Sequence, residues 1–407
     1  MPVNSSLLQK FLFFSLYIFF IFEFFFSPIR YSFSLVGLEG ASYLAKLIML
    51  LAIFLCILDF LYKSVARVEL LFLFLISYLL LIAFFYTGIF PAVFTIFTLT
   101  PLFFGMAVGK IFIRKLNEAY FFKFVLTLLA IAFLGCFIDV FLDYPWSSFT
   151  YKVGDSVIEG NRKWSSGGFE RVSGFFRLSL IASTTVTFFS ILLYFKVNAL
   201  FYRLFFLLVP CFISAITLSK SIFVFNVIFI IYVCFLWVNI KLRFYTVLLL
   251  GLLFFLFTVT MIGYQIDLES PIEVTLLGSF AERLIFTWPE VINMLEGKGG
   301  FLLGGGLGAV GPGSKFIGGD SYVVGDSLYL YLLGSGGGIL CFMLLIWFIY
   351  LGFSLKKGSY VSEVKVALLF YLLVTGIGMS VLDYPILSFA FGLLLNRKVS
   401  GEPRAIT

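Results

Sequence analysis

The sequence contains no histidine, and only 12% of its 407 residues are charged. Histidine is the commonest general base at neutral pH and the commonest metal ligand, so its absence argues against chemistry built on either role. The low charge excludes an ordinary soluble domain, which is about a quarter charged. The five cysteines all lie inside apolar runs, so we expect them to pack as small hydrophobic side chains and not to form a disulfide framework.

Hydrophobic residues make up 62% of the chain, and the mean hydropathy is +1.11. Apolar runs of about 18 residues or more recur from end to end, and each is long enough to cross a hydrocarbon core of about 30 Å. The sequence therefore predicts an all-α polytopic integral membrane protein, with a single membrane domain over residues 1–407. The first run lacks the small-residue cleavage site of a signal peptide, so we expect it to be retained as the first span.

About twelve membrane spans are predicted. Their approximate ranges are 8–27, 44–62, 68–87, 90–109, 120–141, 178–195, 200–218, 221–239, 245–264, 329–354, 362–381 and 386–395. The loops alternate in character, and the short basic set, with two lysines near span ends, holds about 17 of the 28 lysine and arginine residues. By the positive-inside rule both termini lie in the cytoplasm, and two long loops, about 142–177 and 265–328, face outward. The net charge of +7 reflects this distribution, so no nucleic-acid partner is expected.

The first long loop ends in "GGFERVSGFFRLS", residues 167–179, directly before an apolar run. Arg171 and Arg177 lie six residues apart, with Gly174 between them. On one helix they would face different ways, whereas a bend at Gly174 would let both face one cavity. Two interpretations stay open: the arginines snorkel at a span end, or they bind an anion, with Glu170 beside them as a candidate catalytic group.

Other charged residues lie near the membrane edge. Lys220, in "TLSKS", occupies a very short outer turn, where a cation serves either as an interfacial anchor or as a ligand for an anion. Glu23, Asp59 and Asp139 lie inside apolar runs. Each is near enough to a span end that snorkelling or local hydrogen bonding suffices, so they carry no functional prediction.

The second long loop contains "AERLIFTWPEVINML", residues 281–295, which predicts an amphipathic helix at the membrane interface. This helix carries Arg283, and Trp288 is a candidate interface anchor. A glycine-rich turn follows, and its glycines Gly305, Gly306 and Gly308 allow backbone N–H groups to approach an anion or a sugar. The turn is not a P-loop, because the GK[ST] ending is missing.

Two aspartates, Asp320 and Asp326, come after this turn, and Asp326 directly precedes the next span. Two compatible roles are open for Asp326: a base that faces an arginine-lined cavity, or the N-cap of the following helix. An outward cavity with several cations suits a lipid-linked pyrophosphate, because guanidinium groups bind phosphate through two parallel hydrogen bonds. Outside the membrane a glycosyl transfer needs such a lipid-linked donor, and cations would stabilise the charge that develops on the leaving pyrophosphate.

Several of these segments occur in a recognisable order. "RVSGFF", "TLSKS", "ER…W", "LLGGGLG" and "GDSLYLYLLGSGGGIL", over about residues 170–345, resemble the O-antigen polymerase/ligase superfamily of bacterial inner-membrane glycosyltransferases. The resemblance implies a GT-C-like fold with two long periplasmic loops that contain amphipathic helices. It also implies roles for Arg171, Lys220, Arg283 and Asp326, the residues that match its motifs. Together with the other candidates of the two loops, the predicted site has Asp326, Arg283 and Glu170 as catalytic residues, Arg171, Arg177, Lys220 and Arg283 as pyrophosphate-binding residues, and Gly305, Gly306, Gly308, Asp320 and Tyr329 as residues of the glycan-binding loop.

The ligases of this superfamily use a histidine where this chain has Asp326, so the resemblance favours a polymerase (Wzy type). It implies metal-independent, inverting transfer of O-antigen from undecaprenyl pyrophosphate onto a new lipid-linked unit, at the periplasmic face of the Gram-negative inner membrane. No cofactor is expected. The implied partners are the lipid-linked oligosaccharide, the bilayer and a chain-length-determining membrane protein. The alternatives are an O-antigen ligase acting on lipid A–core, a flippase or other transporter of lipid-linked oligosaccharides, and a non-catalytic scaffold.

Overall fold

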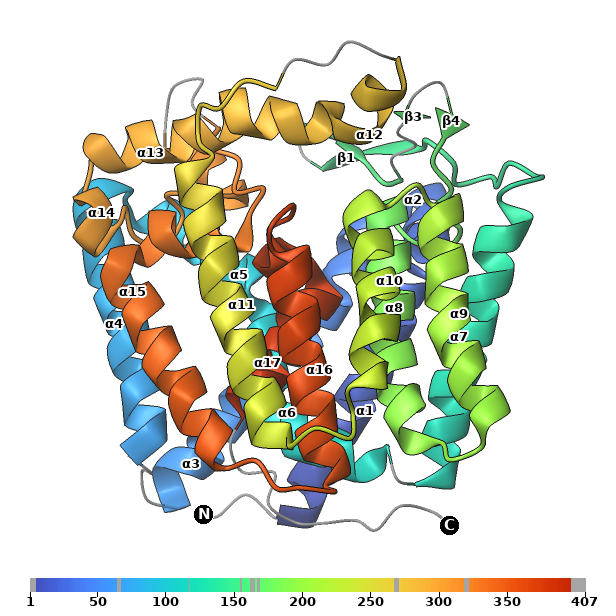
Figure 1. Cartoon of the computed structure of the whole chain (residues 1–407). Coiled ribbons are helices and arrows are strands. Elements are labelled where there is room, and N and C mark those ends of the chain that lie inside the picture. The colour runs from blue at the N-terminus through green and yellow to red at the C-terminus, as the bar shows by residue number, and fades with distance from the viewer. Residues whose placement is uncertain are drawn as a thin grey trace.

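The computed structural model describes residues 5–63, 67–116, 118–153, 156–161, 165–166, 169–266, 271–317 and 322–396. Most of the helices run between an upper and a lower face (Figure 1). The α-helices are α1 (Ser5–Phe24), α2 (Phe26–Leu35), α3 (Leu44–Lys63), α4 (Arg67–Tyr86), α5 (Ile89–Thr98), α6 (Thr100–Lys115), α7 (Ala119–Ile138), α8 (Ser179–Lys196), α9 (Leu200–Ile216), α10 (Lys220–Cys234), α11 (Ile240–Thr260), α12 (Pro271–Glu282), α13 (Trp288–Glu296), α14 (Gly300–Leu303), α15 (Leu328–Phe353), α16 (Tyr360–Thr375) and α17 (Pro385–Leu395). Short 3-10 turns are η1 (Glu39–Tyr43), η3 (Pro312–Phe316) and η4 (Val381–Asp383), and η2 (Arg283–Thr287) is a π-helical turn.

The prediction of an all-α membrane protein is confirmed at the level of helix length and apolarity. In the described part of the chain, six helices are long and apolar enough to cross a membrane, or seven if α5 and α6, bent by 43°, count as one span. Each of the twelve predicted ranges overlaps a helix or this bent pair. However, α9, α10, α16 and α17 have 17, 15, 16 and 11 residues, fewer than the roughly 20 of a straight crossing. The count of twelve spans therefore stays a prediction.

The core lies around α8, α16 and α17. Of the apolar stretch of α8, 89% is buried inside the protein, which is why this helix has no lipid-facing stripe. Nearly all residues of α16 and α17 are also buried. By contrast, only 39% of α7 and 33% of α11 are buried, so these helices present most of their apolar surface outward. Charged groups on the central helices are therefore enclosed by protein.

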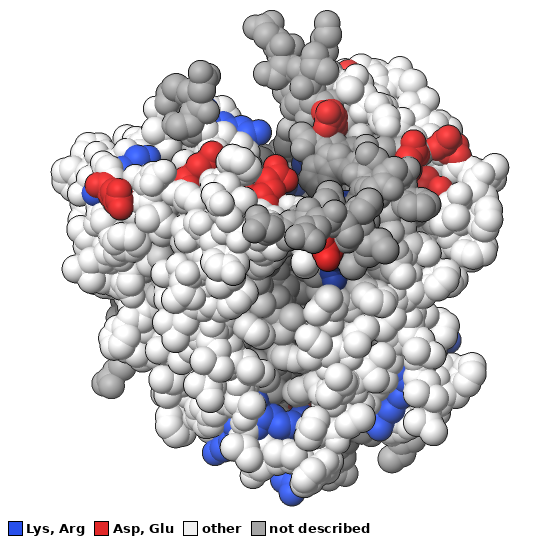
Figure 2. All heavy atoms as spheres, turned by 45° about the horizontal axis from the view of Figure 1, so that its top comes forward, with Lys and Arg blue, Asp and Glu red and all other residues white. Residues whose placement is uncertain are grey.

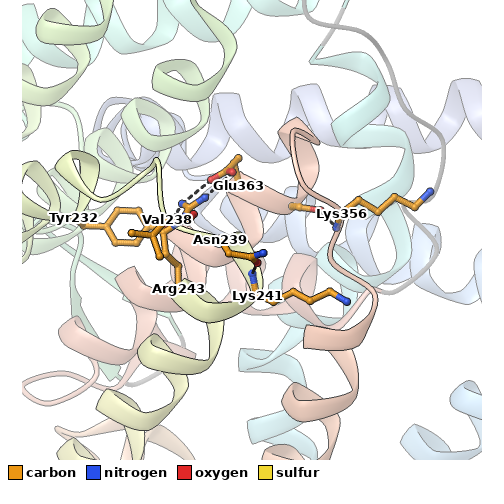
Figure 3. Close-up of polar contacts among 8 residues, drawn as sticks. Tyr232, Val238, Asn239, Lys241, Arg243, Lys356 and Glu363 are labelled. Carbon is orange, nitrogen blue, oxygen red and sulfur yellow. Dashed lines mark hydrogen bonds and ion pairs between the residues drawn. The ribbon is translucent and has the colours of Figure 1, made fainter.

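A charged group on a neighbouring helix, Arg243 of α11, is also enclosed, and it holds α11 against α16 near the lower face (Figure 3). Its Nη1 and Nη2 each donate to one carboxylate oxygen of Glu363 at 2.8 Å. The same guanidinium donates to the Tyr232 hydroxyl at 3.1 Å and to the Val238 carbonyl at 3.0 Å. Only 5% of the Arg243 side chain and 20% of the Glu363 side chain are exposed. This arginine, which the sequence places in a basic loop, is a buried structural residue.

Both long loops contain regular structure at the upper face (Figure 1). The first forms two antiparallel two-stranded sheets, which the sequence did not predict: β1 (Thr150–Val153) with β2 (Ser156–Glu159), and β3 (Ser165–Ser166) with β4 (Phe169–Glu170). In β1–β2, Thr150 pairs with Glu159. In the second loop, α12 and α13 lie across the upper face, and the helix predicted over 281–295 is present, with η2 inside it.

The apolar face of α13 packs inward. Trp288 and Leu295 are fully buried, and Val291 lies between them on the same face. Trp288 is therefore a core residue, and its prediction as an interface anchor is wrong. A helix with apolar residues on one face can pack that face against lipid or against the protein's own core, and the sequence pattern is the same in both cases.

Charged side chains are distributed unevenly between the two faces. Figure 2 turns the upper face of Figure 1 toward the viewer and shows Asp and Glu, together with some Lys and Arg, in the upper part of that view. In the lower part, the charged side chains that are visible are Lys and Arg. The loop composition predicts the same distribution, with most acidic residues on the side of the two long loops and most basic residues on the other side.

Candidate functional site

Three cationic side chains from separate segments come together at the upper side. Arg171 follows β4, Lys220 begins α10, and Arg283 begins η2. Partial burial, together with the neighbouring charge of Arg283, lowers the pKa of Arg171. Lys220 is likewise close enough to Arg171 and Arg283 to be repelled by both. Such a group of like charges is unfavourable by itself, and an anion bound among them would relieve the repulsion.

Asp326 is the acidic member of this group. Its Oδ2 lies 3.5 Å from Nε of Arg283, which makes an ion pair between the second long loop and the residue before α15. Arg283 projects from a π-helical turn, a local distortion that is frequent at functional sites because it redirects a side chain. The pair is only partly buried, so it remains open to a ligand.

The structure answers whether Asp326 caps α15. The N-cap residue is Ser327, and Asp326 precedes it. The Ser327 hydroxyl donates to the Gly376 carbonyl at 3.1 Å, and the Leu328 N–H donates to the same oxygen at 2.8 Å. The cap interpretation is therefore wrong, because the turn after α16 contacts this helix end and leaves the carboxylate of Asp326 to face Arg283.

Arg171 is positioned by a buried turn. The Oδ2 atom of Asp139 accepts hydrogen bonds from the N–H groups of Ser173 at 2.9 Å and Gly174 at 2.8 Å. Trp146 donates from Nε1 to the Gly174 carbonyl at 3.1 Å. Gly174 has a φ of +59°, which favours glycine, and a Cβ there would lie 3.0 Å from the Cys136 nitrogen. The predicted bend at Gly174 is thus present.

A second set of bonds ties the same turn to α2. Asn161 donates from Nδ2 to the hydroxyls of Ser27 and Ser173, both at 3.1 Å, and to the Phe176 carbonyl at 3.0 Å. The Ser27 N–H donates to the Phe175 carbonyl at 3.0 Å. Because its donors and acceptors are engaged on two sides, this turn holds the backbone next to Arg171 in one conformation.

The bend sends Arg177 to a different group of charges. Arg177 acts electrostatically on Glu23, Lys46 and Tyr151, residues of α1, α3 and β1. In this group, Lys46 lies 4.3 Å from the centre of the Phe97 ring. The two arginines of the first loop therefore lie in different groups of charges, and the pyrophosphate role of Arg177 stays a prediction.

Arg30 of α2 completes this second group. Its guanidinium lies over the rings of Phe26, at 4.1 Å, and of Tyr43 and Tyr151, both at 5.4 Å. Arg30 also donates to the Tyr151 hydroxyl. These contacts occupy the guanidinium with protein groups, so they stabilise the packing of α2 and η1 against the first loop.

The remaining predicted residues lie in varied places. Glu170 is exposed in β4, opposite Ser165. Tyr329 donates its hydroxyl to the Leu373 carbonyl at 2.8 Å and joins α15 to α16. Asp320 lies outside the described residues.

The predicted glycines pack the loop closely. The N–H groups of Gly305 and Gly306 donate to the carbonyls of Gly334 and Ser335, both at 2.8 Å. A Cβ at Gly306 would overlap the backbone of Ala83 in α4. The two amides are therefore engaged within the protein, and the expectation that they approach a sugar or an anion is corrected: glycine is needed here for helix contact.

A second carboxylate, Asp383, lies in the turn η4 between α16 and α17 and was not among the residues predicted from the sequence. Burial, with a further contribution from Asp326, raises the pKa of Asp383 to about 7. Asp326 also acts on the neighbouring Tyr384. The available signal was "VLDYP", a single acid between two apolar runs, which gives no indication that it lies beside Asp326.

Comparison of the chain with family models, with curated proteins and with solved structures finds no match of any of the three kinds. The chemistry of the site therefore rests on its own residues. Three cations and two carboxylates, Asp326 and Asp383, meet at the face that carries both long loops. Within the described ranges, no group of three or more Cys, Asp or Glu residues is placed to hold a metal ion.

Proposed function

We propose that this chain is a glycosyltransferase of the O-antigen polymerase type. It transfers a growing glycan from undecaprenyl pyrophosphate onto a new lipid-linked repeat unit at the periplasmic face of the Gram-negative inner membrane. In this proposal the upper face is periplasmic, both termini are cytoplasmic, and the chain crosses the membrane about twelve times in a GT-C-like arrangement. The observation that carries the proposal is the meeting of Arg171, Lys220 and Arg283 beside Asp326.

The cations suit the donor. A pyrophosphate diester carries two negative charges when bound and gains a third when the sugar leaves, so its affinity for cations rises during the reaction. Arg171 and Arg283 each offer a planar pair of donors, and Lys220 adds a compact charge. Donors that meet the charge as it develops are typically worth about 10²–10³-fold in rate each.

The buried setting of Arg171 supports an anionic ligand. Its Nε is buried and has no hydrogen-bond partner among the described residues, although buried polar groups in proteins are nearly always paired. The turn held by Asp139 keeps this side chain near Lys220 and Arg283. A donor fixed beforehand in this way costs little reorganisation when charge develops.

The deciding experiment uses purified protein with a lipid-pyrophosphate-linked repeat unit, in the absence of metal and nucleotide. A polymerase produces a ladder of lengthening glycans on a gel. Supplying lipid A–core in a parallel reaction tests the ligase alternative, which would attach glycan to that acceptor and give no ladder on the lipid-linked unit. Movement of labelled lipid across liposome membranes without any product would instead identify a transporter.

Two variants connect the activity to the site. We expect Arg171→Ala and Arg283→Ala to lower the polymerisation rate by about 10²-fold or more, with protein levels unchanged. Arg283→Lys should recover little activity, because a single ammonium cannot reproduce the two parallel hydrogen bonds. Arg114→Ala, which removes an exposed arginine of α6, is the matched control. Full activity in either site variant would remove that arginine from the proposed site.

A further inference from the structure

Three buried polar atoms lie in the neighbourhood of Asp326. They are the Tyr331 hydroxyl, Ser380 Oγ and Asp383 Oδ1, and within the described part of the chain none is at the full distance and angle of a hydrogen bond, although the Ser380 side chain lies close enough to the Asp383 carboxylate to act on it. Tyr331 is only 2% exposed and Ser380 only 4%. A buried polar atom without a hydrogen-bond partner is uncommon in a folded protein, and three such atoms close together indicate a site that a polar ligand completes.

Loop glycines bring these groups together. A Cβ on Gly311 would lie 2.8 Å from Cε2 of Tyr331 and 3.3 Å from Oδ2 of Asp383, so ring and carboxylate face the same point of the backbone. A Cβ on Gly325, the residue before Asp326, would lie 2.8 Å from Cδ2 of the same ring. The Asp383 N–H donates to the Ser380 carbonyl at 3.3 Å, which places Ser380 in the same turn.

The two carboxylates of this region differ in their surroundings. Asp326 is paired with Arg283 and is therefore tied to the cations. Asp383 is partly buried, and Gly311 and Tyr331 lie against it. The ionisable groups that act on Asp383 or on the adjoining Tyr384 are Asp326, Arg283, Tyr322 and Tyr331. Of these, only Arg283 is a cation, and it is engaged by Asp326.

We propose that Asp383, Tyr331 and Ser380 form the pocket that receives the attacking hydroxyl of the acceptor sugar, with Asp383 as the general base and Asp326 as the residue that positions Arg283 on the pyrophosphate. This inference rests on the proposed function and assigns its acceptor side. The Tyr331 and Ser380 hydroxyls supply hydrogen bonds to the sugar. A site that pairs a substrate hydroxyl with buried polar groups rejects acceptors that lack it, because those groups are then left unpaired.

In the proposed transfer, the anomeric carbon exchanges its bond to the pyrophosphate for a bond to the acceptor oxygen. The acceptor oxygen forms a bond to the anomeric carbon of the donor while its proton passes to the carboxylate of Asp383. The bond between that carbon and the pyrophosphate oxygen breaks, and its electron pair stays on the pyrophosphate, where Arg171, Lys220 and Arg283 stabilise it. Asp383 afterwards releases the proton to water.

The test compares Asp383→Asn with Asp326→Asn in two assays: binding of the lipid pyrophosphate and initial rate of glycan extension against pH. We expect Asp383→Asn to bind the lipid as wild type does but to lose about 10²–10⁴-fold in rate. The wild-type rate should fall below about pH 7, where Asp383 is protonated. Asp326→Asn should bind the lipid more weakly and keep this fall in rate, shifted to lower pH because the charge of Asp326 helps to raise the pKa of Asp383. In Asp383→Asn, the remaining rate should no longer fall below about pH 7.

Tyr331→Phe is the second variant, chosen because it removes a hydroxyl that has no partner among the described residues and so should not unfold the protein. We expect a higher KM for the acceptor and unchanged binding of the donor lipid. A wild-type protein that makes no ladder would reject the proposed function itself. A wild-type ladder with an unchanged rate in Asp383→Asn, or loss of lipid binding in that variant, would overturn only the assignment of Asp383.

Discussion

The Oδ2 atom of Asp139 lies 2.8 Å from the backbone nitrogen of Gly174, and this contact joins the end of α7 to the turn that carries Arg171. Asp139 is the C-cap residue of α7, and it is buried. One carboxylate inside an apolar run thus organises the end of the first long loop. It is a positioning residue, since it acts on the proposed site only through the backbone of Ser173 and Gly174.

Removing this carboxylate should destabilise the protein. Asp139→Ala leaves two buried N–H groups without their acceptor, which we expect to cost about 1–3 kcal/mol of unfolding free energy for each group left unpaired. Thermal unfolding of the purified protein in nanodiscs measures the effect. Glu296→Ala, at the exposed end of α13, is the control. Equal melting temperatures for wild type and Asp139→Ala would show that the two bonds contribute nothing.

Arg171 and Arg177 should behave differently. Arg171 lies with Lys220 and Arg283, whereas Arg177 lies with Glu23 and Lys46. We therefore expect Arg171→Ala to weaken binding of a lipid pyrophosphate by about tenfold or more, and Arg177→Ala to weaken it much less. Titration of both purified variants with the lipid decides the matter. Similar losses of affinity in both variants would mean that the two arginines bind the lipid at one shared site.

The buried ion pair near the lower face should be sensitive to the loss of one partner. Glu363→Ala leaves the Arg243 guanidinium buried without its carboxylate, which typically costs about 3–5 kcal/mol. The exposed pair of Lys115 and Glu118, at 2.7 Å, is the matched comparison, and Glu118→Ala should cost about 0.5 kcal/mol or less. Chemical denaturation of both variants gives the two values. A small loss for Glu363→Ala would mean that water reaches the Arg243 site.

Asp383 should make the stability of the protein depend on pH. Its pKa is raised to about 7 in the folded state, whereas an unfolded chain releases this proton near pH 4. The folded state therefore holds one proton more between these values, and its stability falls as the pH rises from about 4 to about 7. Asp383→Asn should flatten that part of the profile. Melting temperatures across this range check it, and an identical slope in the variant would assign the proton to another group.

The predicted helix ranges are mostly correct, since hydropathy depends on neighbouring residues in the chain. Lys220 lies 49 positions after Arg171 and 63 before Arg283, and spacing alone could not bring them together. The placement of Arg177 depended on a bend whose direction is set by Asp139 and Asn161, which the sequence left without a role. Asp383 was missed because only the fold shows that it lies close to Asp326 and Tyr331. The glycine-rich turn was recognised from the sequence, but the N–H groups of Gly305 and Gly306 donate to the carbonyls of Gly334 and Ser335 and not to a ligand.

The contact of Asp139 with Gly174 also relates the site to the surrounding lipid. Most of α7 is turned outward, so a bilayer of different thickness changes the tilt of this helix at modest cost. Its upper end holds the turn next to Arg171, and a change in tilt is therefore transmitted to the guanidinium. If Arg171 binds phosphate as proposed, acyl-chain length becomes a variable that adjusts the geometry of that binding, and the membrane acts mechanically on the proposed site as well as being its solvent.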